Sequence, residues 1–149
     1  MLIDRLAEIF EEHKAERICV LGTTCCGKTT LLENFPEGVD IDDELFPKMT
    51  KEEAEFIHKK PWTEATGEEW DRLAYKYIKV HAGAPLFGTT VVDCDVVVYL
   101  NIADEILAER CRKRGVDLRD SLNMKKAVEQ DVENHKGDKG KTFYYFNVE

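Results

Sequence analysis

Long apolar segments and organised cysteines are both missing from this sequence. No apolar run approaches the ~20 residues that a helix needs to cross a membrane, and charged residues begin at Asp4, where a secretory signal would continue with apolar ones. The five cysteines match neither zinc-binding nor disulfide spacing, because two of them, Cys25 and Cys26, are adjacent. We therefore predict reduced thiols, no membrane partner and a cytoplasmic location.

Basic residues are too few for a protein that binds nucleic acid along its backbone. The chain has 21 Lys and Arg against 30 Asp and Glu, which gives a net charge of −9 and disfavours sequence-independent binding to phosphates. It also lacks the D-x-x-G and [NT]-K-x-D elements of a GTPase, and it contains no internal repeat. The 149 residues, of which 43% are hydrophobic, predict a single domain over residues 1–149.

The clearest feature that is present is the phosphate-binding pattern G-x-x-x-x-G-K-[ST] at residues 22–29. It lies between an apolar run at 17–21, which predicts a strand, and residues 30–35, which predict a helix. The glycines allow backbone N–H groups to curl around a phosphate. Lys28 would reach the β- and γ-phosphates, and the Thr29 hydroxyl would ligate Mg²⁺. The residues expected to bind ATP are Gly22, Thr23, Thr24, Cys25, Cys26, Gly27, Lys28, Thr29 and Thr30.

Two of these loop residues are thiols. We interpret Cys25 and Cys26 as small side chains that the variable positions of the loop tolerate. The alternative is a redox-sensitive thiol beside a positively charged site.

Hydrophobic periodicity and capping patterns predict the other elements. Apolar residues at helical spacing predict an amphipathic helix at 2–12 that covers the core. Capping boxes at Thr50 and Thr66 predict two helices, the first ending before Pro61 and the second reaching about Gly83 with His81 packed on its apolar stripe. The remaining predicted elements are strands at 39–43 and 96–102, helices at 104–114 and 122–133, and a closing strand at 142–148.

The position of the third sheet strand is left open by residues 77–95. Val91-Val92-Asp93 looks like a strand end with a metal-binding acid. Very few residues then precede the next strand, whereas a parallel crossover needs about a dozen. Either the third strand lies near 77–81 or residues 86–102 form an irregular hairpin, and a Walker B role for Asp93 depends on which is correct.

Asp40 and Asp42 alternate with apolar residues at the end of the predicted strand 39–43. Phosphoryl transfer from ATP needs a carboxylate near Mg²⁺ and a group that orients the acceptor. We predict that Asp40 serves the metal and that Asp42 accepts a proton from the acceptor. The alternative is that both belong to a solvated loop or a helix cap.

The densest positive cluster of the chain lies within residues 110–119. Arg110 and Arg114 share one face of the predicted helix 104–114, so they could grip phosphate together. Arg119 follows Gly115, and we expect it to act from a mobile segment. The basic residues of the cluster are Arg110, Arg112, Lys113, Arg114 and Arg119.

These patterns together resemble the small P-loop kinases, which include adenylate, shikimate and gluconate kinases. The resemblance rests on residues 22–29, on the D-x-D at 40–42, and on the strand 96–102 that leads into the arginine-bearing stretch 106–115. It implies an α/β fold: a single-domain three-layer α/β/α sandwich with a mostly parallel five-stranded sheet in the order 2-3-1-4-5. It also implies a lid-like segment at about 112–140 that closes over ATP.

The predicted function is an ATP- and Mg²⁺-dependent phosphotransferase that moves the γ-phosphate of ATP to a hydroxyl or phosphate of a small metabolite or nucleotide. The acceptor pocket is expected from about residues 44–92, and the protein is expected to be a monomer or homodimer. Two alternatives stay open: a kinase of nucleic acid at a modified base or strand end, disfavoured by the net charge, and a regulatory module that binds nucleotide without transferring phosphate. The predicted catalytic residues are Lys28, Asp42, Arg110, Arg114 and Arg119, and the predicted metal ligands are Thr29 and Asp40.

Overall fold

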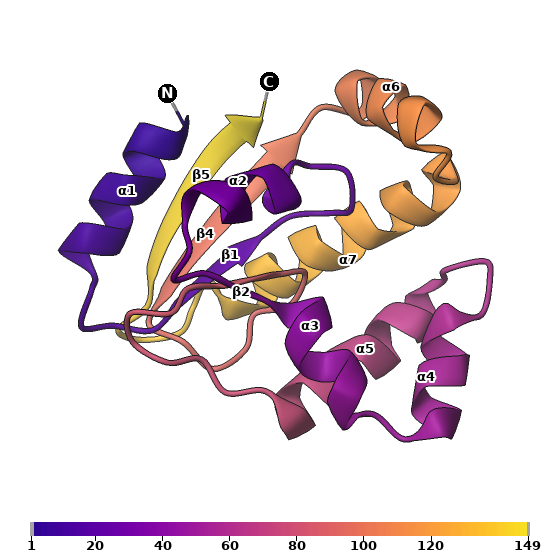
Figure 1. Cartoon of the computed structure of the whole chain (residues 1–149), viewed down its shortest axis with the longest axis horizontal. Helices are drawn as coiled ribbons and strands as arrows, with labels where there is room; N and C mark the ends of the chain where they lie inside the picture. Colours follow the sequence, from indigo (N-terminus) through magenta and orange to yellow (C-terminus); the bar gives the residue numbers. More distant parts are fainter. Residues whose placement is uncertain (1, 149) are drawn as a thin grey trace.

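A computed structural model of the chain describes residues 2–148. Its centre is a five-stranded sheet in the order β2-β3-β1-β4-β5, in which each neighbouring pair of strands is parallel. Helices cover both faces of the sheet, giving a three-layer α/β/α sandwich (Figure 1). The predicted three-layer architecture and strand order are thereby confirmed. The strands are β1 (Ile18–Leu21), β2 (Val39–Asp40), β3 (Leu86–Gly88), β4 (Val96–Ile102) and β5 (Thr142–Val148).

Side chains of the strands alternate between two separate cores. On β1, Cys19 and Leu21 belong to one core, whereas Ile18 and Val20 belong to the other, as the two-residue period of a strand requires. Both β1 and β4 are covered on both faces, which explains why they are apolar at nearly every position. The position of the loop that follows β1 is therefore fixed by a buried strand that is paired on both sides.

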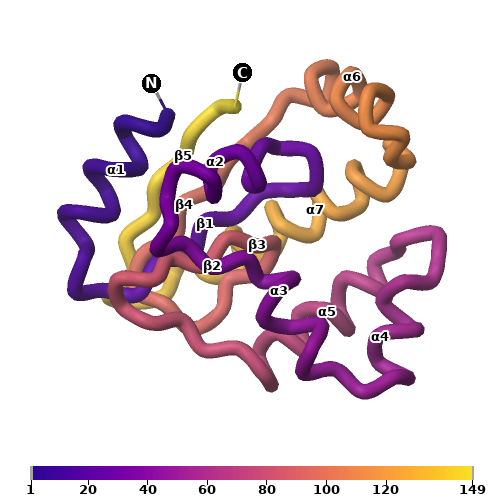
Figure 2. Tube along the Cα trace, in the orientation of Figure 1, coloured from indigo at the N-terminus to yellow at the C-terminus, as the bar shows by residue number. Residues whose placement is uncertain are grey.

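The buried residues of the helices show which face each helix covers. α1 (Leu2–Glu12), α2 (Lys28–Asn34) and α6 (Asp104–Arg114) pack with Val20. α3 (Ile41–Leu45), α5 (Glu64–Tyr77) and α7 (Leu118–His135) pack with Cys19. α4 (Lys51–His58) follows a short 3₁₀ helix, η1 (Phe46–Lys48), and lies beside α5, away from the strands (Figure 1 and Figure 2). Within residues 2–148, no helix has the length and apolar character that spanning a bilayer requires.

α5 begins and ends earlier than predicted. Thr63, not Thr66, is its N-cap. The Thr63 hydroxyl accepts from the Thr66 backbone N–H at 3.4 Å, and the Thr66 hydroxyl accepts from the Thr63 backbone N–H at 3.1 Å. The predicted box is therefore wrong because Thr66 already lies in the first turn. The helix ends at Tyr77, so His81 lies outside it and is exposed rather than packed.

The other predicted helices agree more closely with the structure. The capping box at Thr50 is confirmed, since its Oγ1 accepts from the Glu53 N–H at 3.1 Å and Glu53 Oε1 accepts from the Thr50 N–H at 2.8 Å. α7 starts at Leu118, earlier than predicted, because the Asp117 carboxylate caps it. The predicted bounds of α1, α6, β4 and β5 agree with the structure.

Both alternatives for the third strand are wrong. β3 is the three-residue run Leu86–Gly88, parallel to β1. The connection to β4, residues 89–95, contains no helix and packs against β1, where Val91 and Val92 are buried and Cys19 Sγ donates to the Val92 carbonyl at 3.5 Å. Seven residues suffice for this crossover because β3 ends opposite Leu21 and β4 begins opposite Ile18, so the connection runs back only along the length of β1.

Asp93 is not a Walker B acid. It precedes β4, so it lies at the opposite end of the sheet from the loop that follows β1. Its side chain is 84% exposed and pairs with Arg17 at 3.0 Å, and Arg17 also pairs with Asp95 at 3.2 Å. These ion pairs join the amino ends of β1 and β4.

Two acids on the covering helices hold the crossover. Asp71 of α5 accepts from the Thr90 hydroxyl at 2.7 Å, and Asp131 of α7 accepts from the Val91 backbone N–H at 2.6 Å. Burial raises the pKa of Asp71 to about 6, and the charge of Asp131 adds to the shift while the Thr90 bond opposes it. The ionised form of Asp71 is therefore unfavourable in the folded protein.

We expect Asp71→Asn to stabilise the protein at neutral pH and to have little effect in acid. The folded-state pKa of about 6 lies above the ordinary value of 3.8, so the folded protein binds this proton more tightly and its free energy of unfolding falls as pH rises from about 4 to about 6. Asparagine accepts the Thr90 bond without a charge, and after allowance for partial exposure the gain should be ~1–2 kcal/mol above about pH 7. Thermal melts across this range measure it, with Glu37→Gln in an exposed turn as control. A gain that is equal at every pH would show that ionisation is not its cause.

Candidate active site

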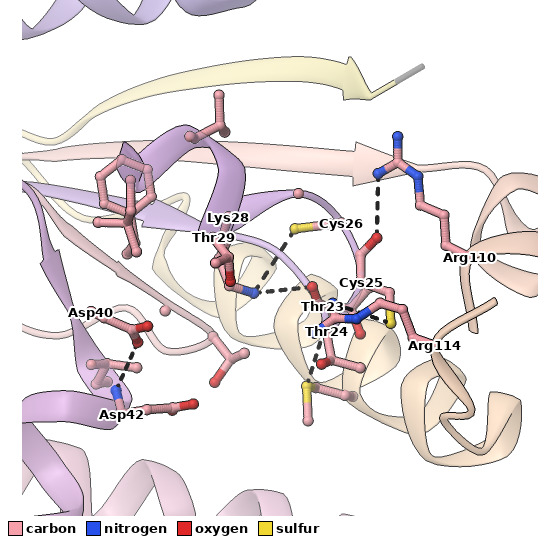
Figure 3. A pocket seen from close by; sticks show the side chains of 18 of the residues that line it. Thr23, Thr24, Cys25, Cys26, Lys28, Thr29, Asp40, Asp42, Arg110 and Arg114 are labelled. Atoms are coloured by element: carbon pink, nitrogen blue, oxygen red, sulfur yellow. Dashed lines mark hydrogen bonds between the residues drawn. The ribbon is translucent and has the colours of Figure 1, made fainter. Parts of the chain in front are cut away.

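The carboxyl end of β1 leads directly into the phosphate loop at residues 22–29. Most of this loop lines a cavity of about 700 Å³. Figure 3 shows the loop in the middle, the two aspartates of the α3 segment on one side and two arginines of α6 on the other. Ligand sites of open α/β sheets lie at the carboxyl ends of the strands, as this cavity does.

Two backbone conformations give the loop its curvature. Gly27 has a φ of 107° and Cys25 a φ of 66°, both in the left-handed region that favours glycine. Cys25 is held there by α6, since Arg110 Nη1 donates to its carbonyl at 3.3 Å and Arg114 Nη1 donates to its Sγ at 3.7 Å. The loop is therefore shaped partly by the helix that carries the predicted phosphate-binding arginines.

Lys28 is the first residue of α2, and its side chain folds back into the loop. Its Nζ donates to the carbonyl of Gly22 and to that of Thr23, the latter at 3.0 Å. Thr29 and Thr30 follow, and both are exposed and line the cavity. An ammonium group and two hydroxyls are thus placed where the loop pattern predicts them.

The first half of the loop is fixed to α7. Thr23 Oγ1 donates to the Ser121 carbonyl at 2.8 Å, and the Thr24 backbone N–H donates to Met124 Sδ at 3.4 Å. Ser121 is fully buried. These bonds fix the position of Thr23 and Thr24 relative to α7.

The thiols of the loop are packed. Cys25 is 6% exposed and Cys26 is 1% exposed. Burial raises the pKa of the Cys25 thiol, and the neighbouring Cys111 adds to the shift while Arg114 opposes it. Because a raised pKa lowers the reactive thiolate fraction, these observations favour small packed side chains over a redox thiol at Cys25.

The predicted strand 39–43 is mostly helix. β2 ends at Asp40 and α3 begins at Ile41, because Asp40 caps the helix: its Oδ1 accepts from the Asp42 backbone N–H at 3.0 Å. The alternative of a helix cap is therefore confirmed for Asp40, which is the N-cap of α3. Both carboxylates nevertheless line the cavity, on the side of the loop near Lys28 and Thr29 (Figure 3).

Asp42 lies in the first turn of α3. The residue is accessible from the cavity, yet protein atoms displace much of the water around its carboxyl group. This burial raises the pKa of Asp42, and the charge of Asp40 adds to the shift while Lys28 opposes it. A general base is most effective when its pKa lies near the operating pH, and the shift at Asp42 is in that direction.

Thr29 and Asp40 fit Mg²⁺ in their chemistry, since both offer oxygen atoms to the same cavity. Mg²⁺ usually takes only one or two protein oxygens and completes its shell with phosphates and water. Among the described residues, no group of three or more His, Cys, Asp or Glu side chains is arranged to hold a metal ion.

Not every predicted residue reaches the cavity. Arg110 and Arg114 line it, together with Lys113. Arg119 is not part of the lining: its side chain is 85% exposed and pairs with Asp117 at 3.3 Å. The segment predicted as a lid, 112–140, consists largely of α7.

Aromatic residues form much of the remaining wall and were not predicted individually. They come from η1, α4, α5 and the segment between the two helices. Their capping patterns indicate helices but do not indicate which side chains face the loop. The aromatic residues of this wall are Phe46, His58, Trp62 and Trp70. The one signal for them in the sequence is that both tryptophans of the chain fall within the expected acceptor region 44–92.

Comparison with protein-family models gives no match, and comparison with curated proteins gives none either. Among solved structures, a deoxyadenosine kinase from M. mycoides, determined with the products dCMP and a flexible dCDP, is similar to this chain. The two share 14% sequence identity, the match covers 89% of this chain and 88% of that chain, and the TM-score is 0.45.

Proposed function

We propose that the protein is an ATP-dependent phosphotransferase of the small P-loop kinase type. The observation that carries the proposal is one cavity in which the loop with Lys28 lies between the carboxylates of the α3 segment and the guanidinium groups of α6 (Figure 3). Phosphoryl transfer requires a phosphate cradle, a group that orients the acceptor, and cations that stabilise developing charge. A module that only bound nucleotide would need no carboxylate such as Asp42 beside the phosphate site.

In the proposed reaction, the backbone of residues 22–29 surrounds the phosphates of ATP. Lys28 turns from the Thr23 carbonyl to the β- and γ-phosphates. Arg110 and Arg114 approach the same phosphates from α6 and stabilise the charge that develops during transfer. Their contacts to Cys25 already hold both guanidinium groups beside the loop.

Thr29 and Asp40 would hold Mg²⁺, the threonine through its hydroxyl and the aspartate directly or through water. When bound, the ion would neutralise charge on the phosphate oxygens. Asp40 is oriented for this by its capping bond to the Asp42 N–H.

Asp42 would accept the proton of the acceptor. The acceptor oxygen then forms a bond to the γ-phosphorus, the bond from that phosphorus to the β–γ bridging oxygen breaks, and ADP leaves with the electron pair. Lys28 lies close enough to Asp42 to lower its pKa partly, so the base and the phosphate-binding cation act in one electrostatic field.

Incubation with ATP, Mg²⁺ and pools of nucleosides, nucleotides, sugars, hydroxy acids and oligonucleotides tests the proposal. Mass spectrometry should find ADP and one phosphorylated product in equal amounts. No product from any pool, with ATP still bound, would favour the regulatory module. Phosphorylated oligonucleotide, together with retention on immobilised nucleic acid at low salt, would favour a nucleic-acid kinase.

We further propose a lid, narrower than the predicted segment 112–140. α7 is anchored in the core by Val128 and Val132, so it is not expected to move as a whole. α6 ends at Arg114 and is capped by Gly115, which has a φ of 68°. We therefore place the closing movement in residues 110–119, which carry the arginines, with the buried Cys111 as its fixed end.

Hydrogen exchange measures this movement. With a non-hydrolysable ATP analogue, we expect added protection at residues 22–29 and 110–119, because guanidinium groups that repel one another are drawn together by the phosphates. The core-packed part of α7, around Val128, serves as the internal control. Added protection at 22–29 with none at 110–119 would show that the arginines are surface charges and that no lid closes.

A further inference from the structure

The two ends of the cavity differ in chemistry. The end formed by α6 is basic, with Arg110, Lys113 and Arg114 in the lining. The end formed by η1, α4 and α5 is aromatic and apolar. Asp40 and Asp42 are the acidic side chains of the lining, and they come from the α3 segment that adjoins the aromatic end. This separation indicates two ligands of different character.

Phe46 is central to the aromatic end. Its ring stacks on His58, with centroids 4.8 Å apart and planes 9° apart, and it contacts the Trp70 ring at a centroid distance of 5.4 Å. Trp62 lies directly against α5, where a Cβ on Gly67 would be 2.7 Å from its ring. These rings form an apolar surface of the kind on which another flat ring stacks.

Trp70 carries a donor that lacks a partner. The residue is 7% exposed, and its indole Nε1 is the buried side-chain polar atom of residues 2–148 that has no hydrogen bond. Indole nitrogen can only donate, and a buried donor without an acceptor is unfavourable. Trp70 lines the cavity, and we infer that its indole N–H pairs with an acceptor atom in the ring of a bound ligand.

Charge disfavours an anionic acceptor at this end. The basic side chains of this part of the lining are His58 and Lys60, and Lys60 Nζ is held 3.2 Å from the Asp120 carboxylate. Asp40 and Asp42 would repel a second phosphate or a carboxylate. An uncharged compound avoids this repulsion.

We propose that the phosphate acceptor is an uncharged hydroxyl compound with a flat heteroaromatic ring, which stacks at Phe46 and Trp70 and presents its hydroxyl to Asp42. The inference rests on the proposed function, which it narrows from hydroxyl or phosphate acceptors to neutral hydroxyl acceptors. A nucleoside has this chemistry. A nucleoside monophosphate or a sugar acid does not.

Intrinsic fluorescence tests the binding of such a compound without requiring turnover. The chain has two tryptophans, and both line the cavity, so quenching reports directly on this site. The probes are adenosine and cytidine, their 5′-monophosphates, and gluconate, each titrated against the native protein. We expect saturable quenching by at least one nucleoside, and binding of its monophosphate that is at least about tenfold weaker because of repulsion by the aspartates.

Two variants and a matched control assign the contacts. Trp70→Phe keeps a ring but removes the N–H, and it should weaken nucleoside binding about tenfold, with Trp62 as the remaining reporter. Phe46→Leu removes the stacking surface from a partly buried position and should weaken binding by a similar factor. Phe56→Leu alters an aromatic residue of α4 that is 43% exposed and outside the lining, and it should leave binding unchanged.

The outcomes separate this inference from the proposed function. Nucleoside binding that responds to Phe46→Leu but not to Phe56→Leu supports the assigned ligand class and site even if no phosphate is transferred, in which case the nucleoside is a ligand and not an acceptor, and the proposed function fails. Monophosphates that bind as tightly as nucleosides, or nucleosides that leave the fluorescence unchanged, would overturn it. If phosphate transfer to a sugar acid or a monophosphate were then found, the proposed function would stand with a different acceptor.

Discussion

Replacing Lys28 by alanine is expected to abolish phosphate transfer while leaving the fold intact. Within the part of the chain that the structure describes, the ammonium group donates to the carbonyls of Gly22 and Thr23 and to the Cys26 sulfur, so its removal opens no gap in either core. In the reaction it would contact the transferring phosphate, and loss of one such contact typically lowers kcat about 10²–10³-fold. ADP formation in the presence of the identified acceptor measures the effect.

The matched control is Lys14→Ala, which removes a lysine whose side chain is 73% exposed and which is not part of the cavity lining. Both variants should melt at nearly the native temperature, and only Lys28→Ala should lose activity. Turnover close to native in a folded Lys28→Ala protein would rule out the proposed reaction.

Asp42→Asn is expected to lower the rate about 10²–10⁴-fold, the usual contribution of a general base. Burial raises the pKa of Asp42, and the base must be ionised to accept a proton. The native rate should therefore fall as pH decreases through this raised pKa, at a higher pH than an ordinary aspartate would give. In Asp42→Asn the acid limb of the pH profile should disappear.

Two neighbouring acids provide the comparison. Asp43→Asn changes an exposed residue of α3 outside the cavity lining and should leave the maximal rate unchanged. Its acid limb should remain and move slightly to lower pH, because the charge of Asp43 contributes to the raised pKa of Asp42. Asp40→Asn should raise the Mg²⁺ concentration needed for half-maximal rate, with only a modest loss of stability because asparagine also caps helices. Identical rates for the variants at positions 40, 42 and 43 would show that this helix start is merely solvated.

The phosphate loop could be predicted because its function fixes both residue types and spacing. Lys28 and Thr29 begin α2 in the structure as the pattern requires, and both glycines stand where the backbone turns. The central strands could also be predicted, since burial on both faces makes β1 and β4 continuously apolar. The strand order came from the family resemblance, because pairing between distant segments leaves no periodic signal in a single sequence.

The start of α3 could not be decided from local residues alone. Aspartate can end a strand or cap a helix, and Val39-Asp40-Ile41 alternates as a strand would. The helical signal was the spacing of Ile41 and Leu45, which are both buried in α3. Five residues are too few for that period to outweigh the alternation.

The aromatic end of the cavity depended on tertiary structure. Trp70 lies on the predicted apolar stripe of α5, and a stripe does not distinguish core from cavity wall. β3 was missed for a related reason: a three-residue strand has no measurable period, and Gly88 resembles a turn residue. β3 is recognisable only from the sheet order, which places residues 86–88 beside β1.

The central place of β1 also sets the order in which the molecule can assemble. Cys19 pairs with Leu86 on one side and with Val97 on the other, so the strand that carries the phosphate loop is completed only by residues from the later part of the chain. During synthesis, which proceeds from the amino terminus, the loop would leave the ribosome long before its flanking strands exist. Such long-range parallel pairing slows folding. The nascent loop, with two thiols still unburied, would wait until β4 has emerged before it acquires the curvature that it has in the folded protein.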